Sequence, residues 1–369
     1  LLACCPSDPS YHSCLIAIGI NSLNAFRILR HVIGFLALTL FLSHGQATLA
    51  QEAVAPGSHD VSPIQLPSQV MGDTRTFWIH LPASYETASQ QHYPVVYLLD
   101  GERLRVPFTG ITDYLTGDVH AHLPDMIVVG IASADRALDF TPTHVPLEQQ
   151  APPFKFAESG GGDRYLEFLE SELIPWVDHH YRTRPHRLLV GHSLGGLMTI
   201  HAASRKESSF QGYLAIDPSL WWDQQSAIDR WENETPSLSN QRLFVATAAH
   251  PDNPNYAALD RAQSRFGEWV KTHNTPQIEI RRFPEDDHGS CVIPAMHRGL
   301  LFLFPDYKLE VRTVATQPEL LTKHFQQFSE VMGSTWAPPE DVIDWFTSFC
   351  RDRNDSAAAQ AFEAMKLGR

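Results

Sequence analysis

The sequence predicts an α/β protein with a mostly parallel central sheet and a short helical appendage at its C-terminal end. Three observations carry this prediction. Short, continuous apolar runs recur along the chain, which is typical of strands buried on both faces. Amphipathic helical stretches separate these runs, as they do in βαβ units. Beyond Pro305 the strand signals stop, and only helical patterns follow.

The expected elements alternate from residue 74 onward. Thr74–Leu81 is rich in β-forming residues and predicts an early strand. Buried strands are expected at Pro94–Asp100, Met126–Ala132, Arg187–Gly191, Gly212–Ile216, Arg242–Ala248 and Gln277–Phe283. Helices are expected at Asp163–His179, Leu194–Ser204, Tyr256–His273 and Val292–Phe304, and in the appendage at Pro318–Met332, Pro339–Phe349 and Ser356–Lys366. The main domain is expected to span residues 51–307 and the helical C-terminal extension residues 308–369.

Composition excludes one large class of partners. The 369 residues include 28 Lys and Arg against 42 Asp and Glu, which gives a formal net charge of −14. A fold that binds nucleic acid through phosphate contacts usually carries a basic surplus. No nucleic-acid partner is therefore expected.

Residues 1–50 have the pattern of an export segment. Arg27 and Arg30 precede the apolar run Val32–Leu42, and Thr48-Leu49-Ala50 supplies small residues before Gln51. A basic patch, a short apolar stretch and a small-x-Ala site are the three parts of a secretory signal. The apolar run is short for a bilayer span, so a membrane anchor and a buried helix are the weaker interpretations. We expect a mature protein that begins near Gln51, is secreted or periplasmic, and has no stable membrane span.

Cysteine and histidine spacing argues against a metal or cofactor. Cys4, Cys5 and Cys14 lie in the export segment, which leaves Cys291 and Cys350. The sequence has no CxxC pair and no HExxH motif. Neither a metal, a cofactor nor a disulfide framework is expected.

The most informative segment is a G-x-S-x-G motif, Gly191 to Gly195, between an expected strand and an expected helix. Such an elbow turns sharply and holds its serine in a strained backbone conformation with the Oγ exposed. Side chains at Gly191 and Gly195 are expected to collide with the neighbouring strand and helix. The start of the helix also directs free N–H groups towards a developing oxyanion. Ser193 is therefore the candidate nucleophile.

A nucleophilic serine needs a base, and in the α/β-hydrolase order the histidine follows the last strand. His288 lies in the loop behind Gln277–Phe283 and is the candidate base. His192 is expected to pack at the elbow, and His297 lies within an expected helix.

The acid should follow the preceding strand, Arg242–Ala248, and Asp252 in that loop is the candidate. Asp260 is an alternative if the next helix starts later than expected. Asp217 is another, if the acid lies one strand earlier. Asp286 and Asp287 are too near His288 in sequence to be favoured.

Four ordered motifs resemble the esterase family of α/β-hydrolases that includes the enterobactin- and bacillibactin-type siderophore esterases. This family is related to the S-formylglutathione hydrolases and feruloyl esterases. The motifs are YLLDGE (97–102), the run from SGGGDRYL to GHSLGG (159–196), DPSLWWD (217–223) and DHGS (287–290). The resemblance implies an α/β-hydrolase fold over residues 60–305 and a serine hydrolase of carboxylic esters, with Ser193 as nucleophile and His288 as base. Family members vary in the acid, and some resemble Ser–His dyads, so the acid stays open.

The same resemblance extends to the tail, which is similar to the tetratricopeptide-like extension of some members. A protein partner that binds the C-terminal helices is therefore a hypothesis.

Further candidates surround the nucleophile. The oxyanion is expected to bind the backbone N–H of Leu194, directly after Ser193, and that of Glu102, in the loop after the first buried strand. Trp221 and Trp222 follow a strand end, where ligands gather, and are candidate substrate contacts. Packing of both indoles in the core or a lid is the alternative.

The predicted function is a serine carboxylic-ester hydrolase that forms an acyl-enzyme, with a siderophore lactone or another small ester as substrate. Three alternatives stay open. An acyltransferase would use an alcohol in place of water in the second step. An inactive hydrolase could serve as a binding module. The helical tail could make the chain a protein-interaction module.

Overall fold

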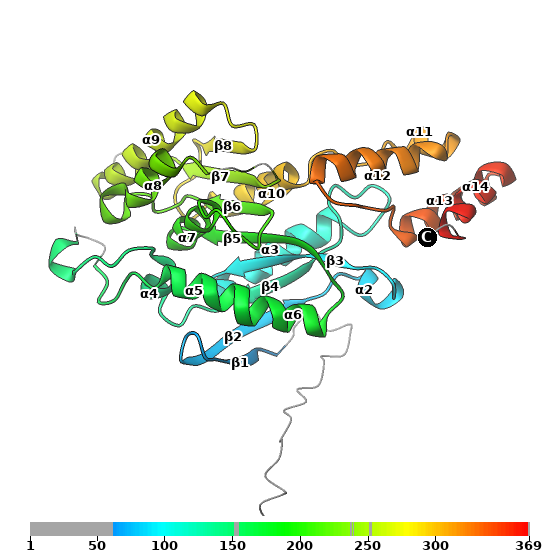
Figure 1. The fold of residues 1–369 in the computed structure, drawn as a ribbon. Coiled ribbons are helices and arrows are strands. Elements are labelled where there is room, and N and C mark those ends of the chain that lie inside the picture. The colour runs from blue at the N-terminus through cyan, green and yellow to red at the C-terminus, as the bar shows by residue number, and fades with distance from the viewer. Residues whose placement is uncertain (1–61, 151–154, 237, 239, 251–252, 368–369) are drawn as a thin grey trace, which may run out of the picture. The chain divides into compact units, whose positions relative to one another are not determined.

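The computed structural model describes residues 62–150, 155–236, 238, 240–250 and 253–367. Strands are interspersed with helices as far as residue 283, and only helices follow (Figure 1). The strands are β1 (Ile64–Ser68), β2 (Asp73–His80), β3 (Tyr93–Leu99), β4 (Ile127–Ile131), β5 (Thr183–His192), β6 (Gly212–Ile216), β7 (Arg242–Ala248) and β8 (Ile278–Phe283). The helices are α2 (Ser84–Thr87), α3 (Gly101–Leu115), α4 (Arg136–Phe140), α5 (Gly162–Phe168), α6 (Ile174–His180), α7 (Leu194–Ala203), α8 (Ser226–Glu234), α9 (Ala257–His273), α10 (Val292–Leu303), α11 (Val311–Thr316), α12 (Glu319–Met332), α13 (Glu340–Asp352) and α14 (Ser356–Leu367).

The eight strands form one sheet in the order β1-β2-β4-β3-β5-β6-β7-β8. β1 pairs with β2, and β2 with β4, in antiparallel register, whereas every pair from β4 across to β8 is parallel. This confirms the predicted mostly parallel sheet of an α/β-hydrolase. Because parallel strands end at the same edge, the loops after β3, β5, β6, β7 and β8 meet there.

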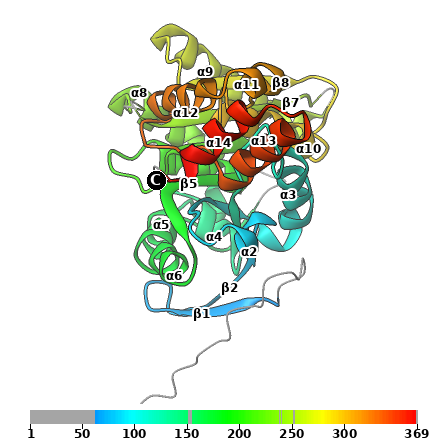
Figure 2. The same ribbon diagram turned by 90° about the vertical axis from the view of Figure 1, so that its right-hand side faces the viewer.

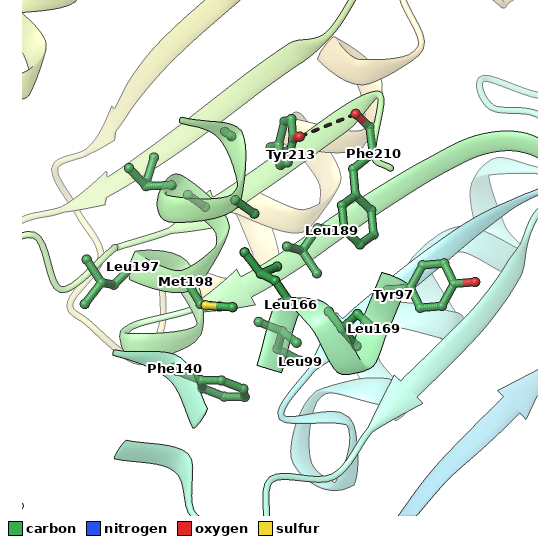
Figure 3. Close-up of a cluster of buried hydrophobic side chains, with 14 of the residues drawn as sticks. Tyr97, Leu99, Phe140, Leu166, Leu169, Leu189, Leu197, Met198, Phe210 and Tyr213 are labelled. Atoms are coloured by element: carbon green, nitrogen blue, oxygen red, sulfur yellow. Dashed lines mark hydrogen bonds between the residues drawn. The ribbon is translucent and has the colours of Figure 1, made fainter. Parts of the chain in front are cut away.

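Alternate residues of each central strand face opposite layers of helices. In β3, Val95, Tyr97 and Leu99 face α5–α9, whereas Val96 and Leu98 face α3 and α10. Figure 3 shows the first of these clusters, where side chains from the sheet meet others from α5 and α7. Each fully buried side chain of this size contributes roughly 1.5–3 kcal/mol to stability, so both layers hold the strand ends in place.

The C-terminal helices α11–α14 extend the second cluster. Phe325, Phe346 and Phe362 are buried and belong to the same apolar cluster as Val96 and Leu98 of β3. The rings of Phe346 and Phe362 stack at 4.8 Å and join α13 to α14, which lie side by side in Figure 2. The three helices predicted after Pro305 are therefore present, preceded by the short α11. The boundary between the main domain and the C-terminal extension, placed between residues 307 and 308, stays a prediction.

Several elements differ from the sequence-based expectation: β1, α2, α4, α8 and α11 were not predicted, and two further differences concern α3 and α5–α6. Helix α3 was not expected, because Gly101, Pro107 and Gly110 lower its helix propensity. It forms because Leu104 and Phe108 are buried against the sheet. The single helix expected at Asp163–His179 is α5 and α6, joined by a π-helical turn at Leu169–Leu173.

Within the described residues, no helix combines the length and the apolar character needed to cross a membrane. The predicted export segment, residues 1–50, lies outside the described residues.

Candidate active site

The G-x-S-x-G motif forms the expected elbow between β5 and α7. Ser193 has φ +61° and ψ −115°, a conformation that residues with a side chain rarely adopt. Its N–H donates to the carbonyl of Ile216 at the end of β6, and its carbonyl accepts the N–H of Ser219. These two bonds hold the strained turn against the loop after β6. The Oγ of Ser193 lies 3.3 Å from the Oγ of Ser219.

The two glycines of the G-x-S-x-G motif differ in how tightly their surroundings exclude a side chain. A Cβ on Gly191 would lie 2.2 Å from the carbonyl oxygen of Gly195, so only glycine fits there. A Cβ on Gly195 would have ordinary contacts, at 3.4 Å or more. The prediction that a side chain at this position would collide with its neighbours is therefore wrong. The crowding falls instead on Gly196, whose Cβ would lie 3.0 Å from the carbonyl oxygen of Ile216.

His288 lies in the loop between β8 and α10 and is held beside the elbow. The ring of His192 packs 4.5 Å from the ring of His288, centroid to centroid. Burial lowers the pKa of His192 to about 3, so its imidazole is neutral, and its Nε2–H donates to the carbonyl of His288 at 2.7 Å. In the same loop, Asp287 Oδ1 accepts the N–H groups of Gly289 and Ser290, which shapes the turn. His192 thus positions the backbone of the candidate base.

The carboxylate in contact with His288 belongs to Asp217, which directly follows β6. His288 Nδ1 lies 2.6 Å from Asp217 Oδ2. Burial alone would raise the pKa of Asp217, but hydrogen bonds from His288, the Ala248 N–H and Gln263 outweigh it and lower this pKa to about 2. Asp217 is therefore a fully buried carboxylate that holds His288 in the Nδ1–H tautomer and leaves Nε2 free to accept a proton.

The other predicted acids have different positions. Asp252 lies outside the described residues. Asp260, on α9, contacts the ring of His250 at 2.9 Å rather than His288. Asp217, which sequence reasoning had weighed only as an alternative, is the described carboxylate next to His288.

The predicted oxyanion donors lie at two helix starts. Leu194 is the first residue of α7, so its N–H has no acceptor within the helix. Glu102 is in the first turn of α3, after Asp100, whose φ is +55°. The turn passes close to β4, because a Cβ on Gly101 would lie 2.3 Å from Gly130. Partial burial raises the pKa of the Glu102 carboxyl, which its own N–H and that of Ser133 both contact.

Arg136 joins these two helix starts. Its guanidinium binds both oxygens of Asp100, at 2.7 and 3.0 Å, and also donates to the carbonyl of His192 at 2.8 Å. One side chain therefore ties the turn before Glu102 to the residue before Ser193. Sequence reasoning missed Arg136, because a single arginine at the start of the short helix α4 carries no local signal.

Comparison with known proteins shows the family of this chain. A family model described as "Putative esterase" matches residues 68–250. The chain is 28% identical over 261 residues to a siderophore enterobactin esterase of Emericella nidulans, covering 58% of this chain and 84% of that protein. It is 27% identical over 256 residues to the ferri-bacillibactin esterase BesA of Bacillus subtilis, covering 63% of this chain and 87% of BesA. The chain belongs to this esterase family.

A solved structure supports the same conclusion. The IroE-like serine hydrolase from Shewanella oneidensis superposes on the esterase with a TM-score of 0.75 and 26% sequence identity. The match covers 84% of this chain and 99% of that one. The α/β-hydrolase fold and an ester-hydrolysing activity are therefore properties of this chain.

The two candidate tryptophans, Trp221 and Trp222, have unequal surroundings. Trp222 is 2% exposed and its Nε1–H reaches the carbonyl and hydroxyl oxygens of Thr143, so it is a core residue. The burial of Trp222 therefore argues against the predicted contact between Trp222 and the substrate. Trp221 is half-buried and packs edge-on against Trp222 at 5.8 Å, which leaves it as the remaining candidate.

Among the described residues of the esterase, Asp217, His250 and His288 bring nitrogen and oxygen atoms within 4.8 Å of one another. Both imidazoles are hydrogen-bonded to the same oxygen of Asp217, at 2.6 and 3.0 Å. The three groups are thus arranged around a carboxylate, and we assign no metal to them.

Proposed function

We propose that this esterase is a serine hydrolase in which Ser193, His288 and Asp217 form a catalytic triad. The observation that carries the proposal is the 2.6 Å contact between His288 and the buried Asp217, next to the strained elbow of Ser193. Asp217 takes the role that sequence reasoning had assigned to Asp252.

In the first step, His288 Nε2 accepts the Ser193 Oγ proton while Oγ forms a bond to the ester carbonyl carbon. The N–H groups of Leu194 and Glu102 stabilise the oxyanion. The Glu102 carboxyl must move away from its own N–H for this to happen. The tetrahedral intermediate collapses, the ester C–O bond breaks, and the imidazolium returns its proton to the leaving alcohol. In the second half, His288 Nε2 accepts a proton from water while the water oxygen forms a bond to the acyl carbon. The bond to Ser193 Oγ then breaks, the imidazolium returns the proton to Oγ, and the carboxylic acid leaves.

For the substrate, we propose a siderophore-type ester or lactone. The support is the family relation: the two relatives described above are named as a siderophore enterobactin esterase and a ferri-bacillibactin esterase, and they are covered over most of their length. Trp221, half-buried near the site, is proposed to contact an aromatic part of such a substrate.

The test is a hydrolysis panel of short p-nitrophenyl esters, a feruloyl ester, a thioester and a catecholate trilactone. We expect kcat/KM to be highest for the trilactone, by about tenfold or more, because specificity appears as differential transition-state binding. Products are identified by mass spectrometry with and without added glycerol. A glyceryl ester as main product would mean an acyltransferase, and a preference for the thioester would contradict the substrate proposal.

We further propose that residues 1–50 direct export and that the mature esterase begins near Gln51. The support is the sequence pattern of Arg27, Arg30 and the apolar run Val32–Leu42. Expression of the full chain followed by N-terminal sequencing of the periplasmic and secreted fractions tests this. A cytoplasmic product that retains Arg27 would contradict the proposal.

A further inference from the structure

Behind the candidate triad lies a second histidine with a carboxylate on each side. His250 follows β7, and its side chain is 2% exposed. Its ring stacks on that of Tyr256 at 4.5 Å with an interplanar angle of 6°, which fixes the plane of the imidazole. His250 Nε2 lies 3.0 Å from Asp217 Oδ2, and its Nδ1 lies 2.9 Å from Asp260 Oδ1.

These contacts determine the protons on the ring. A neutral imidazole has one N–H and one lone pair, and a carboxylate oxygen only accepts. With both ring nitrogens at carboxylate oxygens, a neutral His250 would set a lone pair against a lone pair at one of them. Either His250 carries both protons, or one of the two carboxyls is protonated.

The surroundings of the carboxyls decide between these states. Asp217 Oδ1 accepts the Ala248 N–H at 2.9 Å and Gln263 at 2.8 Å, and Asp217 Oδ2 lies within hydrogen-bond distance of His288 Nδ1 and His250 Nε2. A carboxyl with every position filled by a donor has no room for a proton of its own. The side chain of Asp260 is 39% exposed, so water stabilises its charge. The doubly protonated ring satisfies all of these contacts.

We propose that His250 is a buried imidazolium between Asp217 and Asp260, and that it is a positioning residue which orients Asp217 and extends activity to lower pH. The proposal rests on the triad proposed above. His250 does not touch the reacting atoms and acts through Asp217.

The sign of the pH effect follows from charge. His288 faces Asp217, His192, His250 and Tyr256 from the neighbouring elements, and Asp286 and Asp287 from its own loop. Of these, His250 is the proposed cation, and its ring centroid lies 6.3 Å from that of His288. A nearby positive charge disfavours a second one, so a charged His250 is expected to extend activity to lower pH.

The first test reads the ring directly and is independent of activity. The protein is labelled with ¹⁵N-histidine, and the His250 signals are assigned by their loss in His250→Gln. At pH 7 we expect both ring nitrogens of His250 to carry protons that exchange slowly with water. A His250 ring with one unprotonated nitrogen at pH 7 would overturn the proposal, whatever the enzyme hydrolyses.

The second test separates charge from hydrogen bonding. Glutamine at position 250 can present an N–H to Asp217 but carries no charge. In His250→Gln we expect the pH of half-maximal kcat/KM on the acid side to rise by about 0.5–1 unit, with plateau kcat within about fivefold of wild type. In His250→Leu, which also loses the donor, plateau kcat should fall about 10- to 100-fold.

The matched control is Asp163→Asn. Asp163 contacts the buried His201 at 2.7 Å, in a similar His–Asp pair near the far end of α7. This variant should leave the pH profile unchanged. If His250→Gln is folded, as judged by its Tm, and its profile coincides with wild type, His250 has a structural role only and the proposal fails. The triad would still stand, since its own tests are the losses of activity in Ser193→Ala and Asp217→Asn.

Discussion

Ser193→Ala is expected to lower kcat on every ester substrate by on the order of 10⁴-fold or more, with folding intact. The Oγ is the atom proposed to form the acyl bond, and nucleophile, base and acid act as a unit, so no neighbouring group replaces it. Alanine tolerates the strained φ of +61° no worse than serine, and the two backbone hydrogen bonds of the elbow remain. The measurement is kcat on the best ester of the panel, together with Tm.

Ser204→Ala is the matched control, because Ser204 is a buried serine just after the same helix and lies outside the proposed site. It should retain kcat within about threefold of wild type. If a folded Ser193→Ala protein kept most of its activity, the serine-hydrolase proposal would be wrong. In that case the esterase would use another nucleophile.

Asp217→Asn is expected to give the second-largest loss, about 10²- to 10⁴-fold in kcat. The shape of the side chain is kept, but an amide nitrogen could then face His288 Nδ1. The ring would shift to the tautomer whose Nε2 carries the proton, and such a ring cannot accept the proton of Ser193. The loss of negative charge also removes the partner that stabilises the imidazolium during the reaction. Steady-state kinetics on the same ester, with Tm as a folding check, measure this.

Asp252→Asn discriminates between the two candidate acids. The contact of Asp217 with His288 predicts that Asp252→Asn stays within about threefold of wild type. A collapse of activity in Asp252→Asn with a mild effect in Asp217→Asn would return the role to Asp252. Mild effects in both variants would mean that Ser193 and His288 work as a dyad.

The elbow was predictable from sequence because it depends on local sterics. Five residues between an apolar strand and a helix determine it, and the 2.2 Å clash at Gly191 is a short-range effect of the turn itself. The buried strands were predictable for a similar reason, since continuous apolar runs can be satisfied only between two layers. Helix α3 escaped prediction, because tertiary burial of Leu104 and Phe108 outweighs the poor propensity of its glycines and proline.

Only the tertiary structure determines which side chains lie around His288. The sequence by itself determined the fold class, the strained serine and the loop that carries His288, because each depends on neighbouring residues or on strand order. It left several carboxylates open, since any loop at the carboxyl edge of the sheet can supply an acid. Asp217 is 71 residues from His288 in sequence, and they meet only because β6 and β8 flank β7 and their loops turn towards each other. Arg136 and His250 have no motif, because their roles consist entirely of contacts that packing creates.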